Sequence, residues 1–367
     1  MIDLRLKIQD KKTKINDKII MKTFRNIFFL LLILSSSLLP AQVKIVAVGD
    51  IMLGTAYPNR NDLPSKGENH LLDSLSKYLS DGNVTFGNLE GALTDNLSQA
   101  KNCGGTCYFF GMPTRYGKAL KNAGFDVLSL ANNHSSDFGA IGRKSTKKTL
   151  DSLQIKYAGL YDCETVIFEK DSIKYGFCAF APNNMTVKIT NIPYAEKIVR
   201  KLADSVDVVI VSFHGGAEGS AMQHVPRKSE TYLGENRGNV YEFAHRMIDA
   251  GADVLLGHGP HVTRAVEVYK NRFIAYSMGN FCTYNNVNVK GVSGLSPIFH
   301  IYTDSTGVFE KAQIIPTYQT KHQAPKYDEY KRVINVIQNL TKTDFPEMNN
   351  VITISEDGWI NLLEKSN

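Results

Sequence analysis

Val43-Lys44-Ile45-Val46-Ala47-Val48-Gly49-Asp50 is the stretch of sequence that decides the fold. Its apolar run is typical of a buried β-strand, and it stops at a glycine, so the strand carries the Asp50 carboxylate at its C-terminal end. The same pattern recurs along the chain, where apolar runs that end in polar residues beside glycine alternate with segments of helical spacing. This alternation predicts an α/β fold.

Five of the expected strands end in side chains that can bind a metal ion. Besides Asp50, these residues are Glu90, Asn133, His134, His214, His258 and His261. In open α/β sheets, sites form outside the carboxyl ends of the strands, so we expect these side chains to converge. A mixture of carboxylate, amide and imidazole groups suits Mn²⁺, Fe or Zn²⁺ better than an ion that prefers thiolates.

Each of these residues alone has an ordinary structural explanation. Asp50 alone would be a helix cap, Asn133 a turn former, and His214 a structural histidine. His258 and His261 are separated by Gly-Pro, which excludes a helical pair and indicates a loop that clasps a ligand. Because the pattern occurs in five separate loops, we interpret the set as a metal site.

The positive charge of the chain is concentrated at its N-terminus. Residues 1–41 carry eight of the 42 Lys and Arg residues and three of the 36 Asp and Glu residues, so residues 42–367 are almost neutral. Nucleic-acid binding requires a basic patch on the folded domain, and the composition gives no sign of one. We therefore expect no nucleic-acid partner.

Residues 21–41 resemble a targeting segment. A short basic start at Met21–Arg25 precedes the apolar run Ile27–Leu34 and the small residue Ala41, which is the order of a secretory signal. The run is shorter than the ~20 residues that span a bilayer. A signal cut after Ala41 is preferred to an uncleaved anchor, and residues 1–20 could be an upstream extension if Met21 is the true start. Either reading predicts an exported protein of the periplasm or cell envelope.

The five cysteines favour a disulfide over a thiolate metal site. Cys103 and Cys107 lie in a Gly-rich loop, where an exported context would permit a disulfide. Zinc sites of this type need a second cysteine pair, which is absent from the sequence. Cys178 and Cys282 lie in apolar segments and are expected to be buried small side chains.

The C-terminal region differs from the rest of the chain. We expect three parts: an N-terminal extension with the signal or anchor at 1–41, the main domain at 42–317, and a helical extension at 318–367. The spacing of Val333, Ile334, Ile337 and Leu340 predicts a helix. A helix docked on the domain is favoured over a module that binds a partner.

Six motifs, taken together and in order, resemble the CapA family of poly-gamma-glutamate capsule biosynthesis proteins. They are Gly49-Asp50-Ile51-Met52, Asn88-Leu89-Glu90-Gly91, Ala131-Asn132-Asn133-His134, His214-Gly215-Gly216, Gly257-His258-Gly259-Pro260-His261 and Tyr276-Ser277-Met278-Gly279-Asn280-Phe281. The resemblance covers about residues 43–317. That family is similar to the calcineurin-like metallophosphoesterases, which implies a four-layer α/β/β/α sandwich.

The resemblance also implies roles for the strand-end residues. The implied metal ligands are Asp50, Glu90, Asn133, His214, His258 and His261, which would hold one or two divalent ions. Glu90 would take the place of the bridging carboxylate, and His134 would contact the leaving oxygen.

Two positions depart from the superfamily pattern. The first motif usually has a histidine two residues after the aspartate, but here that position is Met52, which is no ligand for a hard ion. The second motif usually offers two aspartates, but here it offers Asn88 and Glu90. We prefer Glu90 as the carboxylate because a neutral amide cannot bridge two cations by charge. One metal position is therefore expected to lack a ligand.

These features favour metal-assisted hydrolysis, in which bound ions lower the pKa of a water towards neutrality. His134 would act as the general acid, which typically contributes ~10²–10⁴-fold to the rate. The superfamily implies a phosphoester substrate, and the family's link to capsules implies an amide in a poly-glutamate chain. Arg143 and Arg237 could bind substrate anions, although a solvated arginine is the simpler explanation.

The alternative is a protein without catalytic activity. An exported accessory factor could bind or transport an anionic polymer at the cell envelope, together with membrane-bound capsule machinery. Met52 favours this alternative because a weakened centre could bind without turnover. His134 favours an enzyme because a binding site needs no general acid.

Overall fold

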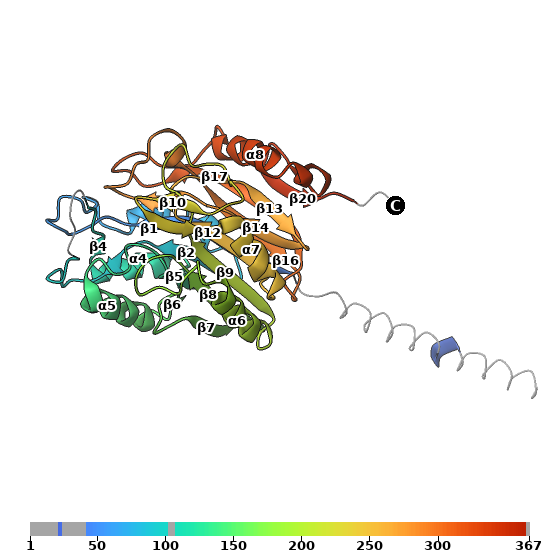
Figure 1. Cartoon of the computed structure of the whole chain (residues 1–367), viewed down its shortest axis with the longest axis horizontal. Helices are drawn as coiled ribbons and strands as arrows, with labels where there is room; N and C mark the ends of the chain where they lie inside the picture. The colour runs from blue at the N-terminus through green and yellow to red at the C-terminus, as the bar shows by residue number, and fades with distance from the viewer. Residues whose placement is uncertain (1–20, 24–41, 102–106, 365–367) are drawn as a thin grey trace, which may run out of the picture. The chain divides into compact units, whose positions relative to one another are not determined.

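Strand β1 (Val43–Met52) is the predicted strand that carries Asp50; it runs two residues beyond Asp50 and lies inside a ten-stranded sheet. The computed structural model describes residues 21–23, 42–101 and 107–364, and residues 42–367 form one unit (Figure 1). Apart from residues 21–23, the expected signal or anchor lies outside the described residues, as does Cys103. In the described residues, no helix is both long and apolar enough to cross a membrane.

The larger sheet is mixed. Its order is β19 (Ile352–Ile354), β20 (Trp359–Leu362), β17 (Phe309–Tyr318), β16 (Leu295–Thr303), β1, β2 (Val84–Leu89), β5 (Val127–Ser129) and β6 (Lys156–Ala158), with β15 (Asn280–Thr283) beside β1 and β18 (Lys326–Tyr327) beside β17. Strands β1, β2, β5 and β6 are parallel, and the strands from β16 to β19 continue the sheet antiparallel. The parallel half therefore gathers its carboxyl ends at one edge.

The smaller sheet has six strands. Its order is β13 (Val266–Tyr269), β14 (Arg272–Ala275), β12 (Val254–His258), β9 (Val208–His214), β8 (Ile173–Phe180) and β7 (Thr165–Lys170). The central four strands are parallel, and β13 and β14 form an antiparallel hairpin. The central strands β9 and β12 are buried at every residue, as expected for parallel strands covered on both faces.

Aromatic contacts connect three of the four layers. Phe86 of β2 packs on Phe177 of β8, with ring centroids 5.6 Å apart, so the two sheets face each other. Phe180 of β8 points the other way and packs on Phe243 of α7 (Val240–Asp249) at 5.3 Å. The helix α6 (Ile192–Ala203) also contacts this outer face. The predicted four-layer α/β/β/α sandwich is confirmed.

The outer face of the larger sheet is covered by a second set of helices. These are α2 (His70–Asp73), α3 (Ser76–Leu79), α4 (Gly117–Asn122) and α5 (Gly139–Ser152), with the 3₁₀ turn η1 (Thr114–Tyr116) before α4. Leu72, Leu79, Leu120 and Leu150 share one buried cluster with Val46 from the outward face of β1. Ile45 and Ala47, which alternate with Val46, belong to the core between the sheets.

The segment after residue 317 joins the same unit. It contributes α8 (Arg332–Asp344), which carries the predicted helical pattern, and also β18, β19 and β20 of the larger sheet. The boundary at 317 stays a prediction, and the structure places the residues on both sides of it within one strand, β17. The remaining short elements are β3 (Ala92–Leu93), β4 (Gly111–Met112), β10 (Glu230–Tyr232), β11 (Glu235–Gly238), η2 (Gly291–Gly294) and η3 (Pro346–Asn350).

Candidate metal centre

Asp50 is held at the end of β1 by its backbone and by a neighbouring amide. Its N–H donates to the Gly279 carbonyl at 2.9 Å. A Cβ on Gly49 would lie 2.0 Å from that same oxygen, so only glycine permits this approach. The buried carboxylate accepts from Asn88 Nδ2 at 2.8 Å. Asn88 thus positions Asp50, which agrees with the preference for Glu90 as the second carboxylate.

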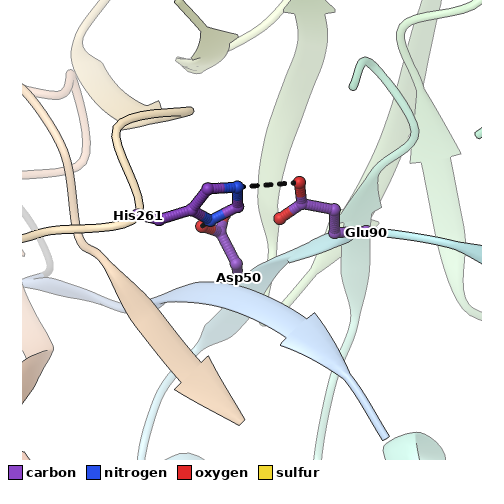
Figure 2. Close-up of side chains that lie close together, drawn as sticks. All are labelled: Asp50, Glu90 and His261. Atoms are coloured by element: carbon purple, nitrogen blue, oxygen red, sulfur yellow. Dashed lines mark hydrogen bonds and ion pairs between the residues drawn. The ribbon is translucent and has the colours of Figure 1, made fainter. Parts of the chain in front are cut away.

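Asp50, Glu90 and His261 bring three potential ligand atoms within 4.8 Å of one another (Figure 2). His261 Nδ1 lies 3.0 Å from Asp50 Oδ2, and its Nε2 lies 3.5 Å from Glu90 Oε1. The backbone of His261 is left-handed, with φ of 57°. This conformation is uncommon for a residue with a side chain and often marks a functional position.

The electrostatics of this cluster favour a cation. Burial alone would raise the pKa of Asp50, but hydrogen bonds and charges from His258 and His261 outweigh it and hold the pKa well below its usual range. Burial raises the pKa of Glu90 well above its usual range. Burial opposes charge on His261, yet Glu90 and Asp50 raise its pKa to about 10. A proton on His261 therefore occupies a field that would also attract a metal ion.

His214 and His258 lie side by side at the ends of β9 and β12, where they are register partners. The loops after them are in close contact, because a Cβ on Gly259 would lie 2.8 Å from the Gly215 carbonyl oxygen. His258 Nδ1 lies 3.2 Å from Asp50 Oδ1. Within the described part of the chain, His258 Nε2 and both His214 nitrogens are buried and have no hydrogen-bond partner.

Burial lowers the pKa of His214 well below its usual value, and the nearby Arg237 charge lowers it further. His214 is therefore neutral, with a lone pair available to a metal ion. A buried polar atom without a partner costs about 1–3 kcal/mol, so this position is unfavourable for the protein alone.

Asn133 and His134 follow β5 and face the same space. Asn132 fixes their loop, because its Nδ2 donates to Asn88 Oδ1 at 3.0 Å and to the Leu89 carbonyl at 2.9 Å. Asn133 Oδ1 is buried and, among the described residues, has no hydrogen-bond partner. This amide oxygen is thus available as a ligand.

His134 is oriented by a residue that the sequence analysis did not identify. Its Nδ1 lies 2.7 Å from Asp137 Oδ2, and its ring packs on Phe110 at a centroid distance of 4.1 Å. Burial opposes charge on Asp137, but His134 and Lys101 outweigh it and lower the carboxyl pKa. With Nδ1 bound to Asp137, His134 would exchange protons with a substrate through Nε2. In the sequence, the only sign of this contact is that Asp137 follows His134 by three residues.

A pocket of about 690 Å³ opens beside these residues. Asn133, His134 and His261 line it together with Lys101, Asn183, Glu218, Tyr232, Arg237 and Asn288. Such a volume can accommodate a small molecule or one segment of a polymer. The pocket gives a substrate direct access to the cluster.

The predicted ligands fit a metal centre. Asp50, Glu90 and His261 supply one group of ligand atoms, and Asn133, His214 and His258 supply further atoms that have no partner in the described chain. Carboxylate, amide and neutral imidazole are suitable ligands for Mn²⁺, Fe or Zn²⁺. The metal roles of these residues stay predictions, and the structure brings Asp50, Glu90, His258 and His261 into one cluster.

Three further sequence expectations have a structural answer. Met52 is buried and its Sδ accepts from Gly54 N at 3.2 Å, so it packs in the core and offers the cluster no ligand. Arg143 donates to Ser136 Oγ at 3.1 Å and is absent from the pocket lining. Arg237 lines the pocket, but Glu218 and Glu235 bind it at 3.0 and 3.1 Å.

The cysteines follow the expected pattern. Cys107 is disulfide-bonded. Cys178 and Cys282 are fully buried and free, and burial raises the pKa of both thiols. Neither contributes to the metal cluster.

Comparison with known proteins places this site in a family. Residues 44–285 match the model of the bacterial capsule synthesis protein PGA_cap. The capsule biosynthesis protein CapA of Bacillus anthracis is 29% identical in an alignment of length 260 that covers 65% of this chain and 59% of that protein. The PGA biosynthesis protein CapA of Bacillus subtilis strain 168 is 27% identical in an alignment of length 320 that covers 80% of this chain and 77% of that protein.

A solved structure also resembles this chain. The 5'-nucleotidase precursor of Thermus thermophilus aligns over 85% of this chain and 61% of its own, with a TM-score of 0.42 and 12% identity. The family match covers all the predicted ligands, from Asp50 to His261. The chain belongs to the bacterial capsule synthesis protein PGA_cap family.

Proposed function

We propose that this protein is an exported metal-dependent hydrolase of capsule polymer biosynthesis, which cleaves a phosphoester or an amide with His134 as general acid. The observation that carries the proposal is the set of buried atoms of Asn133, His214 and His258 that have no hydrogen-bond partner among the described residues, together with the Asp50–Glu90–His261 cluster. Asn133 and His261 line a pocket that is also lined by His134.

The residues divide into those that hold an ion and those that act on a substrate. Asp50, Glu90 and His261 would hold one ion. A second would be held by Asn133, His214 and His258, with Glu90 shared. Bound ions of this kind lower the pKa of a water and neutralise charge on the attacked oxygen.

His134 would give its Nε2 proton to the leaving oxygen or nitrogen. Asp137 stabilises the protonated ring and fixes its orientation, since it holds Nδ1 at 2.7 Å. The ring of Phe110 limits rotation of the imidazole. Asp137 is therefore a positioning residue.

Turnover by the full chain tests the proposal. With Mn²⁺ or Zn²⁺ added, the wild type is assayed on bis-p-nitrophenyl phosphate and on poly-gamma-glutamate, beside His134→Gln and Asp137→Asn. We expect His134→Gln to lower kcat by ~10²–10⁴ while the bound metal is retained. Asp137→Asn should lower kcat less and shift the alkaline limb of the pH–rate profile to lower pH, because the protonated His134 ring loses its carboxylate partner. Wild-type protein that binds metal and cleaves no ester or amide would contradict the proposal.

A second candidate is a non-catalytic accessory factor that binds or transports an anionic polymer. Met52 favours it, because the position is filled by a buried thioether that already accepts a backbone N–H. Two Mycobacterium tuberculosis proteins that are 35% identical over 180 residues are described as probable polyglutamine synthesis accessory proteins. Bound metal and polymer binding without turnover would decide for this role.

Export is the remaining part of the proposal. The disulfide of Cys107 supports an oxidising compartment. The signal-like order of residues 21–41 supports the periplasm or the cell envelope as the destination, with a cleaved signal and an N-terminal anchor as the two alternatives. Membrane-bound capsule machinery would be the neighbouring partner.

A further inference from the structure

Positive charge is concentrated on one pair of helices, although residues 42–367 are almost neutral as a whole. The segments η1, α4 and α5 carry seven Lys and Arg residues and one acidic residue, Asp151. The composition alone could not reveal this patch, because acidic residues elsewhere in the chain balance it.

The two helices form a groove of about 500 Å³. A Cβ on Gly117 of α4 would lie 2.8 Å from Thr149 Cγ2 and 2.7 Å from Leu153 Cδ1, so the missing side chain lets α4 lie close to α5. The groove is lined by Thr114, Arg115, Lys118, Ser145, Lys148, Thr149, Ser152 and Leu153. Its walls therefore combine cations with hydroxyl groups.

Several of the cations are free to bind a ligand. Lys118, Lys121, Lys144 and Lys148 are exposed, and within the described ranges none of them forms an ion pair. By contrast, Arg115 is paired with Glu68 at 3.4 Å and Lys147 with Asp162 at 2.5 Å. The repulsion among unpaired lysines on neighbouring helices would be relieved by an anion.

We propose that the α4–α5 groove is a docking surface for a linear polycarboxylate. Separate exposed lysines are point charges that suit single negative charges repeated along a chain. The choice of a carboxylate polymer as the ligand rests on the proposed function. The helix α5 begins at Gly139, five residues after His134. One wall of the groove therefore follows the candidate site directly along the chain. The surface is distinct from the metal centre and its test does not depend on turnover.

Two other anionic partners fit the surface less well. A helix that inserts into a membrane surface presents large apolar side chains beside its cations. None of the exposed large apolar side chains of the described residues lies on η1, α4 or α5. Single-stranded nucleic acid requires exposed aromatic rings on which bases stack, and the groove lining has none.

Binding of fluorescein-labelled poly-L-glutamate of defined length, followed by anisotropy at pH 7 and low salt, tests the inference on the full chain. We expect Lys118→Gln/Lys144→Gln/Lys148→Gln to weaken binding by about tenfold or more, because each lost charge removes screened Coulomb attraction. The charge-preserving set Lys118→Arg/Lys144→Arg/Lys148→Arg should bind as the wild type does.

The matched control is Lys197→Gln/Lys201→Gln on α6, which removes exposed lysines from the opposite side of the sandwich. It should leave binding unchanged, and thermal unfolding should show all variants folded. Unaltered binding by the α4–α5 variant, or no wild-type binding, would overturn the inference. Equal or tighter binding of an oligothymidine or of phosphatidylglycerol vesicles would overturn the polycarboxylate assignment. Absent hydrolysis would contradict the proposed function alone, since binding is measured without turnover.

Discussion

Two buried polar clusters differ in how they satisfy their hydrogen bonds. In the cluster formed by His245, Glu267 and Tyr276, the Glu267 carboxylate lies 3.0 Å from His245 Nε2 and 2.7 Å from Tyr276 Oη. In the candidate metal centre, His214 has no hydrogen-bond partner among the described residues, and His258 keeps one nitrogen without a partner. The first cluster satisfies its hydrogen bonds within the protein, whereas the second leaves buried nitrogens without a partner in the described part of the chain.

This difference has an energetic meaning. A buried network in which every polar group has a partner stabilises the fold. Truncation of one partner leaves the others buried without a hydrogen bond, which costs their desolvation free energy. Unpartnered imidazoles already carry that cost, so the protein without metal is less stable because of them. Mutation of the first cluster should therefore lower the free energy of unfolding. Replacement of an unpartnered histidine in the second cluster by an apolar residue should leave it unchanged or raise it.

The largest effect is expected in the satisfied cluster. Glu267→Ala leaves the buried Tyr276 hydroxyl and His245 without their acceptor, and we expect the free energy of unfolding to fall by about 3 kcal/mol. Urea unfolding of the full chain measures it. A loss below ~1 kcal/mol would show that the hydrogen bonds of Glu267 do not stabilise the fold, and would contradict the contrast with the metal centre.

A pH dependence comes next. Burial, aided by the Lys44 charge, lowers the pKa of His300 to about 4, while its Nε2 bonds the Tyr78 carbonyl at 2.8 Å. The unfolded chain binds a proton near pH 6.5 and the folded chain does not, so stability is lost as the pH falls from about 6.5 towards 4. One pKa unit corresponds to about 1.4 kcal/mol, so the loss is at most about 3 kcal/mol.

The measurement is urea unfolding at several pH values, with His300→Gln as the comparison. The variant should show a shallower decline over this window, although its stability at pH 7 is lower. Equal slopes in the two proteins would assign the acid sensitivity to other groups.

The smallest effect has the opposite sign. In the presence of EDTA, His214→Leu removes two unpartnered nitrogens at similar volume, and we expect stability to stay constant or rise by about 1 kcal/mol. In the presence of Mn²⁺, the wild type should gain stability by mass action and the variant should gain less. A marked loss of stability in EDTA would mean that His214 is satisfied after all.

The sequence predicted the strand-end residues because of how parallel sheets are built. Asp50 lies near the end of a buried apolar strand, and His214 and His258 are the last residues of theirs. The four-layer fold could be predicted only through the family resemblance, because apolar periodicity does not say which sheet a strand joins. β19 and β20 were missed, since short partly exposed strands give a weak pattern.

Other parts of the site could not be predicted from the sequence, for physical reasons. Asp137 is adjacent to His134 only after the loop has folded around Phe110. The ion pairs of Arg237 with Glu218 and Glu235 depend on where a long loop lies. The α4–α5 groove could not be predicted from the net charge, because net charge does not show where the charged residues lie. The basic patch forms only when two helices pack side by side.

Metal content of the purified full chain tests the central claim most directly. Inductively coupled plasma mass spectrometry is applied to the wild type, to His258→Ala/His261→Ala, and to His224→Ala as a control on an exposed histidine. We expect stoichiometric Mn, Fe or Zn in the wild type and the control, and its loss in the double variant. Wild-type protein without bound metal after metal loading, or a double variant that keeps the wild-type content, would contradict the account.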